Sequence, residues 1–276
     1  ELGQAVDADQ AHVAIRLKRV FPKLPGGVGP MMLMQTDENC KELLWFMERY
    51  PLVFNPPAIK YSMKDQAARF DRRALETQQI LAHTYERPAL PMAKPPRDYQ
   101  LEAAMLNWTN GGLLVGDETG LGKSVTAITM LAGKGTLPAL IVVPAQLQIQ
   151  WRAMVREFYP AASVHIVRST SFYNFGRPDI TICTYHKLSA WSEHFAGKMK
   201  SVVFDEAQEL RRTENLRWPA ACEVAAGASF RMGLSATPVY NYGGEAYNIL
   251  EVTNPGALGD RIEFEIAGDV LICSRV

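Results

Sequence analysis

Cysteine is scarce in this sequence, and nothing in it suggests a disulfide or metal framework. The four cysteines are far apart in a chain of 276 residues: Cys40, Cys183, Cys222 and Cys273. No two of them have the spacing of metal ligands, and this wide spacing also argues against a disulfide scaffold. We therefore expect reduced thiols, as in an intracellular protein.

The sequence also lacks an excess of either charge and any long apolar run. Its 29 basic and 29 acidic residues give a formal net charge of +0, which excludes a global basic field that would attract nucleic acid. A nucleic-acid site would have to be a local patch. No apolar run approaches the length of a membrane span, and no signal peptide is recognisable. We expect no membrane partner and a cytoplasmic, nucleoid or nuclear location.

The length and composition suit one large α/β domain and a smaller module, with 47% hydrophobic and 21% charged residues as in a soluble globular protein. Residues 1–56 predict a small α+β accessory module. Within it, 12–20 alternates like a half-buried strand, 31–35 reads as a second strand, and 36–47 continues as a helix. Residues 57–95 predict a helical and proline-rich linker.

The large domain, residues 96–276, contains a glycine-rich loop at 116–124. The apolar run 113–115 leads into the loop and a helix-like stretch leads out of it. Loop amides and a helix N-terminus together hold phosphates, and glycines let the backbone approach them. In this arrangement Lys123 would reach the β- and γ-phosphates and the Ser124 hydroxyl would bind Mg²⁺.

Apolar segments alternate with helical ones through the rest of the domain, which predicts a doubly wound parallel sheet with ligands at its carboxyl edge. The predicted strands are 139–144, 164–167, 179–185, 200–208, which ends in acidic residues, and 230–238. Asp205 and Glu206 end one of these strands about 80 residues after the loop, where they would hold Mg²⁺ and polarise an attacking water.

Taken together, these stretches resemble the first motor domain of superfamily-two helicases and translocases. The matching segments are Gly116 to Ser124 (motif I), Asp205 to Gln208 (motif II), Ser235 to Thr237 (motif III), 96–100 (the adenine-reading motif), 142–144 with 150–151 (motif Ia), and Thr184 with Tyr185 (motif Ib). The resemblance implies a RecA-like P-loop parallel sheet with helices on both faces, preceded by a small α+β module.

Within that superfamily the sequence is most similar to the Swi/Snf-like branch of DNA translocases, of a phage or bacterial type. The segment Asp117 to Ser124 differs little from that branch's Asp-Glu-Met-Gly-Leu-Gly-Lys-Thr, although the general phosphate-loop pattern has glycine where Asp117 stands. Pro238, Asn241 and residues 254–259 also follow the branch's pattern. Gln208 replaces the branch's usual histidine, and Ser-Ala-Thr replaces its usual Thr-Gly-Thr.

The resemblance implies ATP and Mg²⁺ as cofactors and DNA, double-stranded and contacted through its backbone, as partner. Residues implied in catalysis are Lys123, Asp205, Glu206 and Gln208. Those implied in nucleotide binding are Arg97, Gln100, Thr119, Gly120, Leu121, Gly122, Lys123 and Ser124. Ser124 and Asp205 would bind the metal, and Pro144, Gln146, Gln150, Thr184 and Tyr185 would contact nucleic acid. Ser235 and Thr237, with Gln208, would transmit the nucleotide state.

Such motors have a second RecA-like domain that supplies an arginine finger, and no second series of strands follows Gly259. We therefore expect the amino-terminal half of a longer protein, weakly active alone, in which 270–276 leads out of the first domain. Two alternatives remain. One is an RNA helicase or a restriction-type translocase. The other is a non-hydrolysing nucleic-acid-binding module that uses 1–95, with its basic cluster Arg16, Lys18 and Arg19, as the reader.

Overall fold

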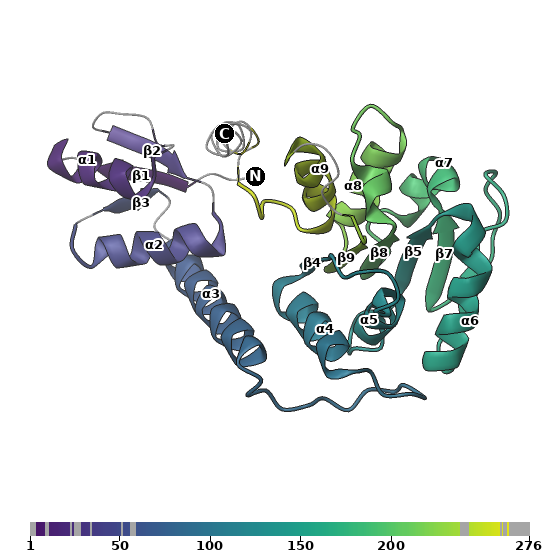
Figure 1. Cartoon of the computed structure of the whole chain (residues 1–276). Helices are drawn as coiled ribbons and strands as arrows, with labels where there is room; N and C mark the ends of the chain where they lie inside the picture. Colours follow the sequence, from purple (N-terminus) through teal and green to yellow (C-terminus); the bar gives the residue numbers. More distant parts are fainter. Residues whose placement is uncertain are drawn as a thin grey trace, which may run out of the picture. The chain divides into compact units, whose positions relative to one another are not determined.

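The chain divides into two compact units, Glu1–Tyr85 and Glu86–Val276 (Figure 1). The computed structural model describes residues 4–8, 11–22, 24, 29–33, 35–50, 52–55, 59–237, 243–259, 261 and 264. No helix in these ranges combines the length and the apolar character that a membrane span requires.

The first unit is a small α+β module, built on a three-stranded antiparallel sheet in the order β2-β1-β3. Its elements are β1 (Gln4–Ala8), α1 (Ala11–Val20), β2 (Gly29–Leu33), α2 (Asp37–Met47), β3 (Val53–Asn55) and α3 (Ile59–Leu81). The second strand and the helix after it were predicted. Strands β1 and β3 were not predicted, and β3 has only three residues, too few to show an alternation.

The expected strand over 12–20 is wrong, because this segment forms helix α1. Its buried residues are Val13, Ala14 and Leu17, a spacing that fits the 3.6-residue period of a helix. Apolar and basic residues alternate by coincidence at the C-terminal end of the segment, where Arg16 and Lys18 are both exposed. Over ten residues the two periods are hard to separate.

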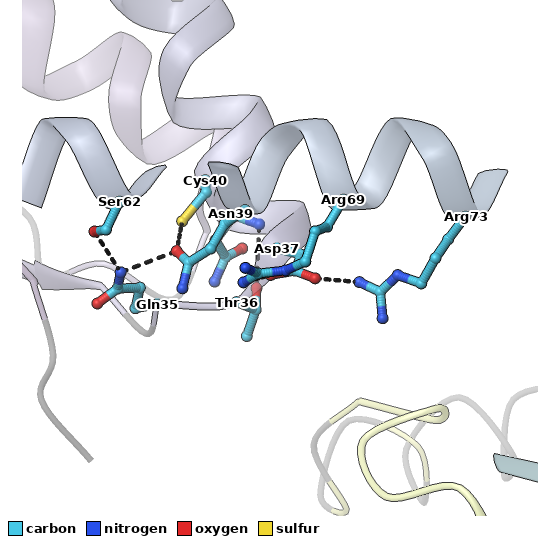
Figure 2. Close-up of polar contacts among 9 residues, drawn as sticks. Gln35, Thr36, Asp37, Asn39, Cys40, Ser62, Arg69 and Arg73 are labelled. Atoms are coloured by element: carbon cyan, nitrogen blue, oxygen red, sulfur yellow. Dashed lines mark hydrogen bonds and ion pairs between the residues drawn. The ribbon is translucent and has the colours of Figure 1, made fainter. Parts of the chain in front are cut away.

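Helix α3 packs on α2 and so belongs to the first unit rather than to a linker. Met63 of α3 lies in one apolar core with Leu43 and Phe46 of α2. Figure 2 shows a polar clasp between the same two helices, in which Asp37 of α2 accepts hydrogen bonds from Arg69 at 3.0 Å and Arg73 at 2.5 Å, both of α3. The helix expected within 57–95 is present as α3, and the stretch without helix or strand covers 82–97.

The second unit is a six-stranded sheet in the order β4-β9-β8-β5-β7-β6, in which every pair is parallel. Its strands are β4 (Gly112–Val115), β5 (Ala139–Val143), β6 (Val164–Ile166), β7 (Ile180–Thr184), β8 (Ser201–Asp205) and β9 (Phe230–Leu234). Its helices are α4 (Asp98–Asn110), α5 (Lys123–Leu131), α6 (Gln148–Phe158), α7 (Tyr185–Phe195), α8 (Arg217–Ala226) and α9 (Gly243–Thr253).

Alternate residues of each central strand enter two separate cores, so the sheet is covered on both faces. Ile141 and Val203 pack with α4, α5 and α6 in one core. Val142 and Phe204 pack with α7, α8 and α9 in the other. A strand buried on both faces is apolar throughout, which explains why the sequence shows these strands as continuous apolar runs. The predicted doubly wound sheet is confirmed.

The clasp at Asp37 generates a test of the first unit. Replacing Asp37 with Ala removes both arginine contacts and one acidic group from the first turn of α2, which should cost about 1 kcal/mol of local stability. Amide hydrogen exchange in α3 should then become about fivefold faster. The matched control is Glu38→Ala, which removes an exposed acid from the same turn. Equal effects of the two substitutions would contradict a specific role for the clasp.

Candidate nucleotide-binding site

Three sequence motifs meet at the carboxyl edge of the sheet because of the strand register. Asp205 at the end of β8 lies opposite Leu234 of β9, and Leu234 lies opposite Val115 of β4. The amide of Ser235 continues the pairing by donating to the carbonyl of Val115 at 3.0 Å. The glycine-rich loop after β4, the acidic end of β8 and the Ser-Ala-Thr segment after β9 are therefore neighbours.

The glycine-rich loop turns into α5 through two glycines with left-handed backbone angles, Gly120 at φ +89 and Gly122 at φ +78. Gly122 caps the helix and Lys123 is its first residue. The Lys123 ammonium donates to the backbone carbonyls of Asp117 at 2.7 Å and Glu118 at 3.0 Å. These acceptors are neutral, so an anion entering the loop would be a stronger partner for the ammonium.

Gln100 lies behind the loop and is only 5% exposed. Its side-chain oxygen accepts from the amide of Arg97 at 3.0 Å, and its side-chain nitrogen faces the carbonyl of Gly122 at 3.4 Å. Tyr99 adds a shorter hydrogen bond from its hydroxyl to the carbonyl of Leu121, at 2.6 Å. Gln100 thus holds the loop in place, a role not anticipated from the sequence. The assignment of Gln100 and Arg97 to adenine stays a prediction.

Asp205 is 8% exposed, and both oxygens of its carboxylate accept hydrogen bonds inside the protein. Oδ2 accepts from the indole nitrogen of Trp151 at 2.6 Å, and Oδ1 accepts from the amide of Glu206 at 3.1 Å. Burial raises the pKa of Asp205, while the Trp151 hydrogen bond and the charge of Lys123 oppose this rise. Trp151 is therefore part of the site. The sequence matched it only as part of motif Ia and did not indicate this contact with Asp205.

Glu206 is linked to the Ser-Ala-Thr segment through Gln208. The side-chain nitrogen of Gln208 donates to Glu206 Oε2 at 2.5 Å, and its side-chain oxygen accepts from the Ser235 hydroxyl at 2.7 Å. Ser235 Oγ also accepts from the backbone amide of Thr237 at 3.1 Å. A carboxamide can donate and accept at once, so glutamine completes this chain. Pro238, Asn241 and residues 270–276 lie outside the described residues.

The predicted nucleic-acid contacts separate into two groups. Gln146 and Gln150 follow β5 and are exposed, with Pro144 half-buried before them. Thr184 and Tyr185 are buried, and the Tyr185 hydroxyl donates to the backbone carbonyl of Asp205 at 2.9 Å. A phosphate cannot reach these two side chains in this structure. Neither side chain supplies the predicted contact, because both pack inward against the sheet. Nucleic-acid contact by the segment after β7 stays a prediction.

A parallel sheet whose carboxyl edge places a glycine-rich loop beside an acidic strand end defines a P-loop domain of the RecA-like class. The chain belongs to the SNF2-related domain family, whose model matches residues 34–274. The resemblance to a Swi/Snf-like first motor domain is thereby confirmed.

Individual relatives agree with this family. The uncharacterized ATP-dependent helicase YqhH of Bacillus subtilis is 29% identical over 183 residues, covering 62% of this chain and 31% of that protein. The DNA repair protein rhp54 of Schizosaccharomyces pombe is 26% identical over 201 residues, covering 60% of this chain and 22% of that protein.

Among solved structures, the SWI2/SNF2 ATPase core of Sulfolobus solfataricus in complex with dsDNA matches with a TM-score of 0.61 at 22% identity. The match covers 69% of this chain and 42% of that one. At this identity it shows the shared fold. This chain spans less than half the length of each of these three proteins.

The loop geometry predicts that a side chain at Gly122 would displace Gln100. A Cβ there would lie 2.7 Å from the Gln100 nitrogen, whereas Gly135 has the same φ of +78 with nothing within 4 Å. Gly135→Ala should cost about 1 kcal/mol of unfolding free energy from backbone strain alone. Gly122→Ala should cost at least about 1 kcal/mol more, because it also displaces Gln100. Urea denaturation measures both, and equal losses would show that Gln100 does not constrain the loop.

Proposed function

We propose that this chain is the first motor lobe of an ATP-dependent DNA translocase or helicase acting in repair, recombination or remodelling. One observation carries the proposal. The glycine-rich loop, Asp205 and the hydrogen bonds that link Glu206 through Gln208 to Ser235 all lie at one edge of the sheet. Family membership supports it, since relatives include an ATP-dependent helicase and a DNA repair protein.

The residues at this edge fit a nucleotide bound together with Mg²⁺. Mg²⁺ is usually held by one or two protein oxygens, several waters and substrate phosphates. Ser124 at the start of α5 and Asp205 supply such oxygens, and the described residues hold no cluster of three or more His, Cys, Asp or Glu that would form a protein-only metal site. Bound Mg²⁺ would offset the charge of the phosphates.

Groups of the chain itself would bind the phosphates and orient the attacking water. Lys123 would exchange its loop carbonyls for the β- and γ-phosphates, and the amides around Thr119, Gly120 and Leu121 would cradle them. Glu206 would orient the attacking water. Because Gln208 binds both Glu206 and Ser235, a change at the γ-phosphate that moves Glu206 would also move Gln208 and Ser235.

Nucleic acid is proposed to bind along the exposed segment after β5. Gln146 and Gln150 offer neutral donors there, which suit sequence-independent contact with a phosphate backbone. The structural neighbour described as a complex with dsDNA favours duplex DNA as the partner. A second RecA-like domain carrying an arginine finger would complete the catalytic site, so the chain alone is expected to hydrolyse ATP weakly.

Two substitutions in the full-length protein test this function. Lys123→Ala removes the phosphate-binding cation and Glu206→Gln removes the water-orienting carboxylate. Each should lower DNA-stimulated ATP turnover by at least about a hundredfold. Lys134→Ala is the matched control, because Lys134 is an exposed lysine just beyond the end of the same helix and should leave turnover unchanged.

Wild-type turnover in either site variant would show that the catalytic assignment is wrong. The same assay distinguishes the substrates when duplex DNA, single-stranded DNA and RNA are compared as activators. Strongest stimulation by duplex DNA is expected. Strongest stimulation by RNA would favour an RNA helicase, and nucleic-acid binding without any turnover would favour a non-hydrolysing module.

A further inference from the structure

Two buried aromatic side chains reach Asp205 from the two segments that sequence motifs assigned to nucleic acid. The Trp151 indole, on α6, donates to the carboxylate at 2.6 Å. The Tyr185 hydroxyl, on the first residue of α7, donates to the backbone carbonyl of the same residue at 2.9 Å. Trp151 and Tyr185 are 1% and 4% exposed, so neither has a role at the surface.

The two contacts come from opposite faces of the sheet. Trp151 belongs to the core that also contains Val203, while Tyr185 belongs to the core that contains Phe204. Side chains alternate along a strand, so the Asp205 carboxylate lies on the same face as Val203, where Trp151 donates to it. The end of β8 is therefore held from one face at its carboxylate and from the other at its backbone.

The Trp151 contact also fixes the orientation of the carboxylate. An indole has a single N–H and cannot accept a hydrogen bond, so it defines one direction. A carboxylate offers about four lone-pair positions, and Trp151 with the Glu206 amide uses two of them. The remaining positions are free to bind a water that itself binds a metal ion.

Trp151 and Tyr185 both lie next to segments for which contact with nucleic acid is predicted. Trp151 follows the exposed Gln150 directly on α6, so any shift of the helix that moves Gln150 also moves the indole. Tyr185 is the first residue of α7, after the end of β7. Burial keeps the pKa of the Tyr185 hydroxyl well above its ordinary value, so this hydroxyl remains a donor.

We propose that Trp151 and Tyr185 are positioning residues that couple nucleic-acid binding after β5 and β7 to the placement of the Asp205 carboxylate. The coupling rests on the proposed function. It assigns to two core residues a task that packing alone would not require: the DNA-dependent alignment of the group that holds Mg²⁺ beside the phosphates.

The test uses the full-length protein with Trp151→Phe, Tyr185→Phe and the control Trp191→Phe. Trp191 is also 1% exposed and also donates through its indole, at 2.8 Å, but to the carbonyl of Ser169. Each substitution keeps a large ring and removes one donor. Two readouts are compared. The first is the Mg²⁺ concentration at which the rise in melting temperature caused by ADP reaches half of its maximal value. The second is the ratio of ATP turnover with duplex DNA to turnover without it.

Trp151→Phe should raise the required Mg²⁺ concentration about tenfold, as loss of an outer-shell partner does at metal sites, and should lower the stimulation ratio severalfold. Tyr185→Phe should lower the ratio with a smaller shift in Mg²⁺. The Kd for duplex DNA should stay unchanged in both, and Trp191→Phe should match the wild type in every readout.

The proposal is overturned if Trp151→Phe and Trp191→Phe give the same Mg²⁺ requirement and the same stimulation ratio. If Trp151→Phe does not fold, Tyr185→Phe decides, and a wild-type ratio overturns the coupling. A wild-type protein without any DNA stimulation would instead contradict the proposed function. The Mg²⁺-dependent stabilisation would still show whether Trp151 positions Asp205.

Discussion

The burial of the Asp205 carboxylate is the constraint around which the second unit is arranged. A carboxylate removed from water needs hydrogen-bond donors. Without them its burial costs several kcal/mol, or the group takes up a proton and loses its charge. The indole of Trp151 and the amide of Glu206 supply those donors. Because Asp205 ends a strand paired on both sides, its position follows from the parallel register of the sheet. The same register brings the glycine-rich loop and Ser235 beside it.

The loop is held in a comparable way from behind. Tyr99 and Gln100 bind its carbonyls from the start of α4, and Lys123 binds two more carbonyls from within. All of these acceptors are neutral, so the cation remains available for a stronger anionic partner. The loop is thus ordered before a ligand arrives, which reduces the entropy lost on binding.

The parts of this structure that could be predicted from sequence are those with a local signal. Continuous apolar runs predicted the central strands, and the glycine-rich loop and Asp205 predicted the site's edge. Helix α1 was mistaken for a strand because ten residues carried both periods. The contacts of Trp151 and Tyr185 join residues 54 and 20 positions apart. No local pattern encodes such distances, so these contacts, and the burial of Thr184, required the fold.

We expect the carboxyl edge of this sheet to bind a nucleotide with Mg²⁺, and the hydrogen bonds that link Glu206, Gln208 and Ser235 to respond to it. Amide hydrogen exchange with and without a non-hydrolysable ATP analogue and Mg²⁺ tests it most directly. Nucleotide binding at this edge should slow exchange in 118–125, 205–208 and 235–237, with no change in 173–178 at the amino edge of β7. Unchanged exchange in 118–125, or protection confined to another part of the chain, would contradict it.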